Sequence, residues 1–201
     1  MVRLGWLDPL LQSGTVRQGN EPRAGTGVAL VVVAVVAAAL AAISLYACRF
    51  GDRIPACWPA NALPLALLLT RQPTGWRLPA SIIIASAAGI VLASLAAGAT
   101  WVTSFSWGGA NSIEIASAAM IAWLPRGTRP RLRRLNGLLK LVLAIGIAGP
   151  GLGAVVGAAI GPPGGYGAAW LVWFASHALG NLIFTAGAMI LLDRTQECVF
   201  R

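Results

Sequence analysis

The chain has 201 residues, of which 57% are hydrophobic and 10% are charged, and its mean hydropathy is +0.75. Soluble domains carry about 25% charged residues, so this composition is typical of an integral membrane protein and excludes an ordinary soluble domain. The net charge of +9 does not indicate nucleic-acid binding, because the basic residues form short clusters between apolar runs, with no basic groove interleaved with aromatic residues.

The chain begins with a polar, weakly basic stretch, residues 1–26, which we interpret as a disordered cytoplasmic tail. It is too long and too polar for the charged start of a signal peptide. The apolar run at 27–48 ends in "LYAC", which resembles a lipoprotein cleavage box. Because this run is long enough to cross a bilayer, we expect an uncleaved first helix instead.

Apolar runs near the length of a bilayer crossing, about 20 residues, follow one another along the chain. They predict six transmembrane helices, at about 27–48, 55–70, 78–99, 101–124, 136–160 and 168–192. The second is the doubtful one, because it is short, with Pro59 near its start and Pro64 inside it. A proline removes a backbone hydrogen bond and kinks a helix. This run therefore either crosses the bilayer or dips into it and returns.

Positive charge favours the crossing, because cytoplasmic loops collect Arg and Lys. With six crossings, the basic cluster at 126–134 shares one side with both chain ends, and only Arg49 and Arg53 lie on the other. A dipping second segment would place that cluster outside. We therefore expect an all-α, polytopic membrane bundle of six transmembrane helices, in a bacterial inner membrane, with both termini cytoplasmic.

Small residues recur every four positions on two predicted helices. The fifth helix carries Gly149, Gly153, Gly157 and Gly161, and the third carries Ser81, Ala85, Gly89, Ala93 and Ala97. In lipid, helices associate where small residues let their backbones approach. These stripes predict close helix packing, either within one chain or between the chains of a homo-oligomer.

Glu114 is the single acid inside the predicted helices, and His177 is the single histidine of the chain. Placing a charge at mid-membrane costs about 2.5–3.5 kcal/mol on insertion scales, so such residues are functional hypotheses. Helical spacing puts Ser104, Trp107, Asn111, Glu114 and Ala118 on one face, and Trp170, Trp173, His177 and Asn181 on another. Glu114 and His177 differ in depth by only about 6 Å at 1.5 Å per residue, so we expect them to meet directly or through a water.

We predict from this a polar pocket between the fourth and sixth helices. Its predicted lining is Asn111, Glu114, His177 and Asn181, capped by Trp107, Trp170 and Trp173, with Trp58 and Asn61 of the second helix closing it. The alternative is that the polar residues only make hydrogen bonds that fix helix packing. Trp101 and Trp170 also suit an aromatic belt at the membrane interface.

The sequence shows no catalytic constellation, and we expect a non-enzyme without metal or cofactor. It lacks a nucleophile with a base and an orienting acid, a paired-carboxylate motif and a phosphate loop. Cys48, Cys57 and Cys198 have no metal-ligand spacing, and one histidine cannot complete a zinc site with them. Cys48 and Cys57 either pair in an oxidising compartment or are ordinary thiols.

Three stretches together resemble the bacterial membrane-associated sensor domain of the first type. They are "CWPANALPLALLL" with "GWRLPA", then "GGANSIEIASAAMIAWLPR", and finally "WLVWFASHALGNLIFTAGAMILL", in the family's order over about residues 55–193. The chain departs from that pattern at Asn61 and Ala62, where a glycine is expected, and at His177, where the family usually has Asp. No proline closes the last helix.

The resemblance implies that residues 27–193 form a six-helix sensory input module. Relatives carry about eight predicted helices joined to a cytoplasmic histidine kinase, diguanylate cyclase or phosphodiesterase. Residues 194–201 would be a cytoplasmic tail without an output domain, so we expect a partner of that kind acting in trans. Two alternatives stay open: a substrate-binding subunit of an energy-coupling vitamin transporter, which "GPPGGYG" faintly resembles, and a membrane scaffold that binds no ligand.

Overall fold

The computed structural model describes residues 25–47, 55–70, 75–123, 134–160 and 165–192. Every regular element within these ranges is a helix, which confirms the predicted all-α class. Four helical stretches are long and apolar enough to cross a membrane: Thr26–Ala47, Arg77–Ala96, Leu135–Ile160 and Tyr166–Leu192. The predictions made for residues 1–24, for the basic cluster at 126–133, for Cys48 and Cys198, and for Gly161 fall outside the described residues.

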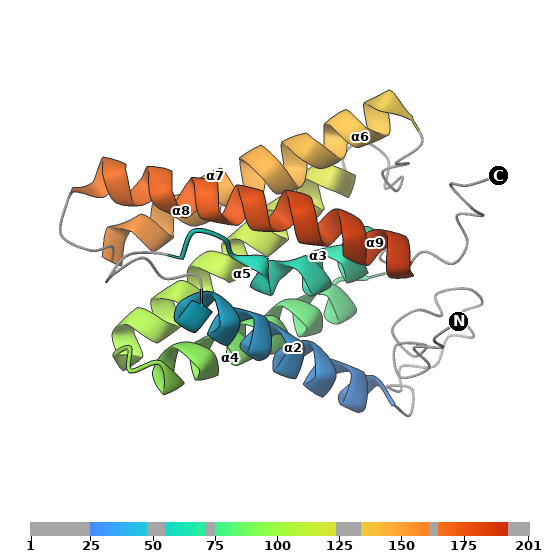
Figure 1. Cartoon of the computed structure of the whole chain (residues 1–201). Coiled ribbons are helices and arrows are strands. Elements are labelled where there is room, and N and C mark those ends of the chain that lie inside the picture. The colour runs from blue at the N-terminus through green and yellow to red at the C-terminus, as the bar shows by residue number, and fades with distance from the viewer. Residues whose placement is uncertain (1–24, 48–54, 71–74, 124–133, 161–164, 193–201) are drawn as a thin grey trace.

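The described helices lie alongside one another in an elongated bundle (Figure 1). α5 runs through its middle, packed against α4 on one side and α7 on the other. α2 covers α4, and α8 lies against α7. In chain order the elements are α2 (Thr26–Ala47), η2 (Pro59–Asn61), α3 (Ala62–Leu69), α4 (Arg77–Ala96), α5 (Trp101–Trp123), α6 (Leu135–Leu141), η3 (Val142–Ala148), α7 (Gly149–Gly157), η4 (Ala158–Ile160), α8 (Tyr166–Gly180), η5 (Asn181–Thr185) and α9 (Ala186–Leu192).

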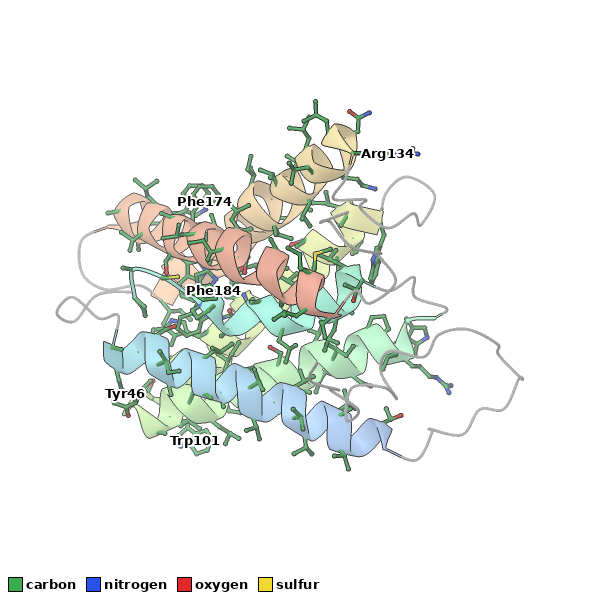
Figure 2. The ribbon with its side chains drawn as sticks, turned by 45° about the vertical axis from the view of Figure 1, so that its right-hand side comes forward. Tyr46, Trp101, Arg134, Phe174 and Phe184 are labelled. Carbon is green, nitrogen blue, oxygen red and sulfur yellow. The ribbon has the colours of Figure 1, made fainter. Side chains whose placement is uncertain are left out.

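Helix packing leaves the large apolar side chains of the outer faces exposed, as expected for a bundle covered by lipid. Examples are Val31, Ile84, Leu171, Ile183 and Leu191, each more than half exposed. Tyr46, Trp101 and Phe184 likewise project from the bundle in Figure 2. The polar side chains discussed below are instead buried between the helices.

The second predicted helix is shorter than the sequence pattern indicated. Only Pro59–Leu69 is helical, as a three-residue 3-10 turn followed by eight α-helical residues, and Pro55 to Trp58 are not. The early prolines explain this start, because Pro59 opens the turn and Pro64 lies in the first turn of α3, where its missing N–H breaks no helical bond. At 1.5 Å per residue such a helix covers about half of a 30 Å hydrocarbon core.

This short helix is enclosed by the rest of the bundle. Nearly all residues from Trp58 to Thr70 are buried, and α3 contacts α2, α4, α5 and α9. The non-helical segment before it is tied down at its end, where the Trp58 backbone N–H donates to the Ser176 carbonyl at 3.2 Å. Non-helical backbone at membrane depth is tolerated only where protein covers it or where it lines a hydrated cavity. Enclosure therefore makes the broken helix possible.

The small-residue stripe on α4 lets α2 approach it closely. A Cβ atom at Gly89 would lie 2.1 Å from the Ala34 carbonyl oxygen and 3.1 Å from the Ala38 backbone nitrogen. One turn further along α4, Ala93 is buried against Ala37 and Ala41 of α2. The contact is thus backbone against backbone, as small-residue stripes in lipid predict.

Replacing Gly89 with alanine is expected to lower the free energy of unfolding by about 1–3 kcal/mol, because the new methyl group overlaps the α2 backbone and forces the helices apart. Titration with sodium dodecyl sulfate, followed by circular dichroism, measures the change. Gly109→Ala on α5 is the matched control, since nothing lies within 4 Å of its Cβ position. Equal midpoints for the two variants would contradict this packing.

Candidate functional site

The carboxyl group of Glu114 lies at the centre of a buried polar cluster. Glu114 is fully buried, near the middle of α5. Its Oε2 atom shares a hydrogen bond with His177 Nδ1 at 2.5 Å, and its Oε1 accepts one from Asn181 Nδ2 at 2.7 Å. Both carboxyl oxygens are therefore partnered, which offsets the cost of removing them from water.

His177 is held between two indole rings. Trp173, one turn earlier on α8, stacks on the imidazole with ring centroids 4.6 Å apart and an interplanar angle of 21°. Trp58 also stacks on the imidazole, at 5.4 Å and 12°. The imidazole is thus enclosed by aromatic rings on the side chains of two different segments of the chain.

Asn181 connects this pair to a third helical stretch, η3. It does so through a backbone carbonyl group that no helical hydrogen bond uses. Its Nδ2 atom donates to the Ile145 carbonyl at 3.1 Å as well as to Glu114. Ile145 lies in η3, a π-helical stretch in which the Gly149 N–H donates to Ala144 instead. The next residue, Pro150, has no N–H to offer. The Ile145 carbonyl is thus available to a side chain, and Asn181 occupies it.

Two π-helical stretches border the cluster. η3 contains Ile145, and η5 begins at Asn181. The two stretches contact each other. π-helical turns are rare, occur frequently at functional sites and are conformationally less regular than α-helix. The sequence prediction did not include them, although Pro150 inside an apolar helix was an available signal.

A second hydrogen-bonded chain anchors Trp58. Its Nε1–H donates to Asn111 Oδ1 at 2.8 Å, and Asn111 Nδ2 donates to the Trp107 carbonyl at 2.8 Å. Together with the bond from the Trp58 backbone to Ser176, this ties the segment before α3 to both α5 and α8. Trp58 therefore links the Asn111 group to the imidazole of His177 by stacking.

Glycines form the walls of the cluster. A Cβ atom at Gly153 would lie 2.9 Å from Glu114 Cβ and 3.0 Å from Oε2. At Gly157 it would meet the Trp173 ring at 2.5 Å, and at Gly149 the Ala118 Cβ at 2.8 Å. At Gly180 it would lie 2.2 Å from the Trp58 carbonyl oxygen. The stripe on α7 thus packs directly against the polar site and not only against another helix.

The structure brings most of the predicted site residues together. Glu114, His177 and Asn181 are hydrogen-bonded, Asn111 is bonded to Trp58, and Trp173 lies edge-on to Trp107 at 6.3 Å. Trp170 is partly buried against the apolar group that contains Trp173, and it stacks on Phe174 at 5.2 Å. Asn61 is fully buried, and neither its Oδ1 nor its Nδ2 has a hydrogen-bond partner.

The contributions of Ile145, Ser176 and Gly180 were not predicted from the sequence. Ile145 and Ser176 act through backbone carbonyl groups, which every residue type has, so the sequence does not indicate them. No group of three or more His, Cys, Asp or Glu side chains suited to a metal ion occurs among the described residues. The site offers a buried hydrogen bond between a carboxyl group and an imidazole, enclosed by aromatic rings and amides and joined to three helical segments.

The MASE1 family model matches residues 26–197, which include all the described helices and every residue of the cluster. No curated protein and no solved structure matches the chain.

Proposed function

Because the chain belongs to the MASE1 family, whose members are membrane sensory domains, we propose that it receives its signal at the Glu114 cluster inside the helical bundle. The family is sensory and not itself catalytic, and the apolar helices mark an integral membrane protein. The same match favours a sensor over the transporter-subunit alternative.

This proposal rests on the buried carboxyl group of Glu114, whose hydrogen bonds, directly and through Asn181, join α5 to two other helical segments. Glu114 on α5 bonds His177 on α8, and Asn181 extends the contact to Ile145 in η3. A ligand, or a proton gained or lost by this pair, alters these bonds and thereby the packing of α8–α9 and α6–α7 on α5. A signal shifts such an equilibrium only by its differential affinity for the two packings.

The proposed topology has six membrane segments, with both ends of the chain in the cytoplasm. In support, the start of α2 and the end of α9 lie at the same end of the bundle in Figure 1, where α4 and α6 also begin. The sequence clusters its arginines in the connections at this end, which is typical of a cytoplasmic side. In this topology the segment from 55 to 70 crosses the membrane, with its helical part toward the cytoplasm and its non-helical part toward the outside.

The output partner in this proposal is a cytoplasmic histidine kinase or a cyclic-di-GMP enzyme of a bacterial inner membrane system. Repacking of α9 and α6 reaches that partner, because both helices have an end on the proposed cytoplasmic side. The partner is either a separate protein or a further domain.

Co-purification from the native membrane tests this function. The tagged chain is extracted in mild detergent after cross-linking, and bound proteins are identified by mass spectrometry. We expect to recover a histidine kinase, a diguanylate cyclase or a phosphodiesterase. For the topology, we expect protease to cleave a tag placed after Arg201 only in inside-out vesicles. An ATPase together with a membrane coupling subunit would instead overturn the sensor in favour of a transporter.

A further inference from the structure

Two buried indole groups in the bundle have no hydrogen-bond acceptor. They are the Nε1–H groups of Trp107 on α5 and Trp173 on α8. Other enclosed indoles are satisfied, since Trp58 donates to Asn111 Oδ1 at 2.8 Å and Trp123 donates to the Leu68 carbonyl at 3.3 Å. Buried donors in native proteins are nearly always paired, so this exception indicates a partner other than the described chain.

Two buried hydroxyl groups accompany the indoles. Ser104 lies one turn before Trp107 and Ser176 one turn after Trp173, and neither Oγ atom has a partner. Ser94 and Ser112 instead donate to the carbonyl one turn earlier in their helix, whereas Ser86 on α4 is also buried without a partner. All four unpaired groups precede the Glu114–His177 pair along α5 and α8, and so lie between the pair and the end where those helices begin.

The indoles determine the kind of partner. An indole Nε1–H donates and cannot accept, so its partner has an acceptor atom. Trp107 and Trp173 form an edge-on pair with an interplanar angle of 60°. In such a pair only one ring directs its edge at the face of the other, so an N–H···π contact serves at most one of the two donors. At least one indole requires an oxygen acceptor.

The charges nearby favour a neutral partner. The described cationic side chains are Arg77 at the start of α4, Arg134 directly before α6 and Lys140 in the last turn of α6. Arg134 and the starts of α4 and α6 lie at the far end of the bundle (Figures 1 and 2). Glu114, the described acid, is already bonded to His177 and Asn181. An anion at the indoles would find no free counter-charge among these residues, and a buried unpaired charge is strongly unfavourable.

Apolar side chains pack around the two indoles. Trp173 packs with Ala110, Ala154 and the partly buried Trp107, and its ring lies on the backbone at Gly157. We propose that Trp107 and Trp173 bind a neutral, lipophilic carbonyl compound, whose oxygen accepts their indole N–H groups while its apolar body packs among these residues. This inference rests on the proposed sensory function, for which it names the chemical class of the signal.

Nuclear magnetic resonance of the tryptophan Nε1–H groups tests this inference directly. The full chain, with ¹⁵N-labelled indoles in lipid nanodiscs, is titrated with tetramethyl-1,4-benzoquinone, which has no free ring position for thiol addition. Its matched probe is 1,2,4,5-tetramethylbenzene, which keeps the methyl-substituted ring and lacks the oxygens. We expect the Trp107 and Trp173 signals to move downfield with the quinone only.

Conservative variants assign the signals and measure the contribution of each donor. Trp107→Phe and Trp173→Phe each remove one signal, and each is expected to weaken quinone binding about threefold to tenfold, the range for one neutral hydrogen bond. Trp101→Phe is the matched control, because Trp101 is 67% exposed. Equal shifts with both probes, or no movement of the two signals in the unsubstituted chain, would overturn the carbonyl ligand.

The outcomes keep this inference separate from the function on which it rests. Recovery of a kinase or cyclic-di-GMP enzyme without quinone-dependent shifts leaves the sensor in place and removes the carbonyl ligand. If the chain shows quinone-dependent shifts but co-purifies with a transporter ATPase, the binding site is supported and the sensory function is contradicted.

Discussion

Replacing Glu114 with leucine is expected to lower the free energy of unfolding by about 3–5 kcal/mol, the range for removing one partner of a buried polar pair. The variant leaves His177 Nδ1 and Asn181 Nδ2 facing an apolar side chain in a fully buried site. It therefore loses the bonds of Glu114 and also leaves the polar groups of its partners unsatisfied. Detergent titration followed by circular dichroism measures the loss, with Ile113→Leu on the exposed side of α5 as control.

Glutamine at position 114 separates the structural role from the ionisable one. Its amide oxygen still accepts from Asn181, and its amide nitrogen faces His177, so we expect a loss of about 1 kcal/mol, near the net value of one hydrogen bond. The carboxyl group, which can gain or lose a proton, is nevertheless gone. A sensor that uses it loses its response while staying folded, whereas a scaffold in which these residues only fix packing has no response to lose.

A double-mutant cycle with His177→Leu checks that the pair acts as a unit. The double variant is expected to lose about 0.5–3 kcal/mol less than the sum of the two single variants, the range for residues in direct contact. Additive losses would show that Glu114 and His177 contribute independently, contrary to the 2.5 Å contact.

Replacing Gly180 with alanine is expected to be the most damaging change of one methyl group at this site. The new Cβ would lie 2.2 Å from the Trp58 carbonyl oxygen and 2.5 Å from its carbonyl carbon. A side chain can rotate away from such an overlap, but a backbone cannot, so the segment before α3 must shift. We expect a loss of about 3 kcal/mol, the upper part of the range for overpacking, together with displacement of Trp58 from His177.

Near-ultraviolet circular dichroism and detergent titration measure these two effects. Gly187→Ala, seven residues further along the same helical stretch, is the matched control, because nothing lies within 4 Å of its Cβ position. Alanine is the better helix former by about 1 kcal/mol, so the control is expected to be neutral or slightly stabilising. A Gly180→Ala chain as stable as this control, with an unchanged aromatic signal, would contradict the described packing of Trp58.

The sequence alone determined the class of the protein and most of its helices. The runs predicted at 78–99 and 136–160 appear as Arg77–Ala96 and Leu135–Ile160. This agreement has a simple physical reason: an apolar segment in lipid must satisfy its own backbone hydrogen bonds, and a helix does so within the segment. Helical spacing likewise placed Asn111 and Glu114 on one face, because that relation is local.

Only the tertiary structure decided which groups touch Glu114. His177 is 63 residues away in sequence. Counting residues along each helix gave the depth of Glu114 and His177 in the membrane, but not whether the faces that carry them point toward each other. The stacking of Trp58 on His177 and the bond of Asn181 to the Ile145 carbonyl also depend on how the helices are arranged. The late start of the helical part of 55–70 has a local cause in its prolines, but its burial depends on the helices around it. Contacts within a helix follow from residue spacing, whereas contacts between helices follow from which backbones approach closely, and here glycines on α7 and α8 make that approach possible.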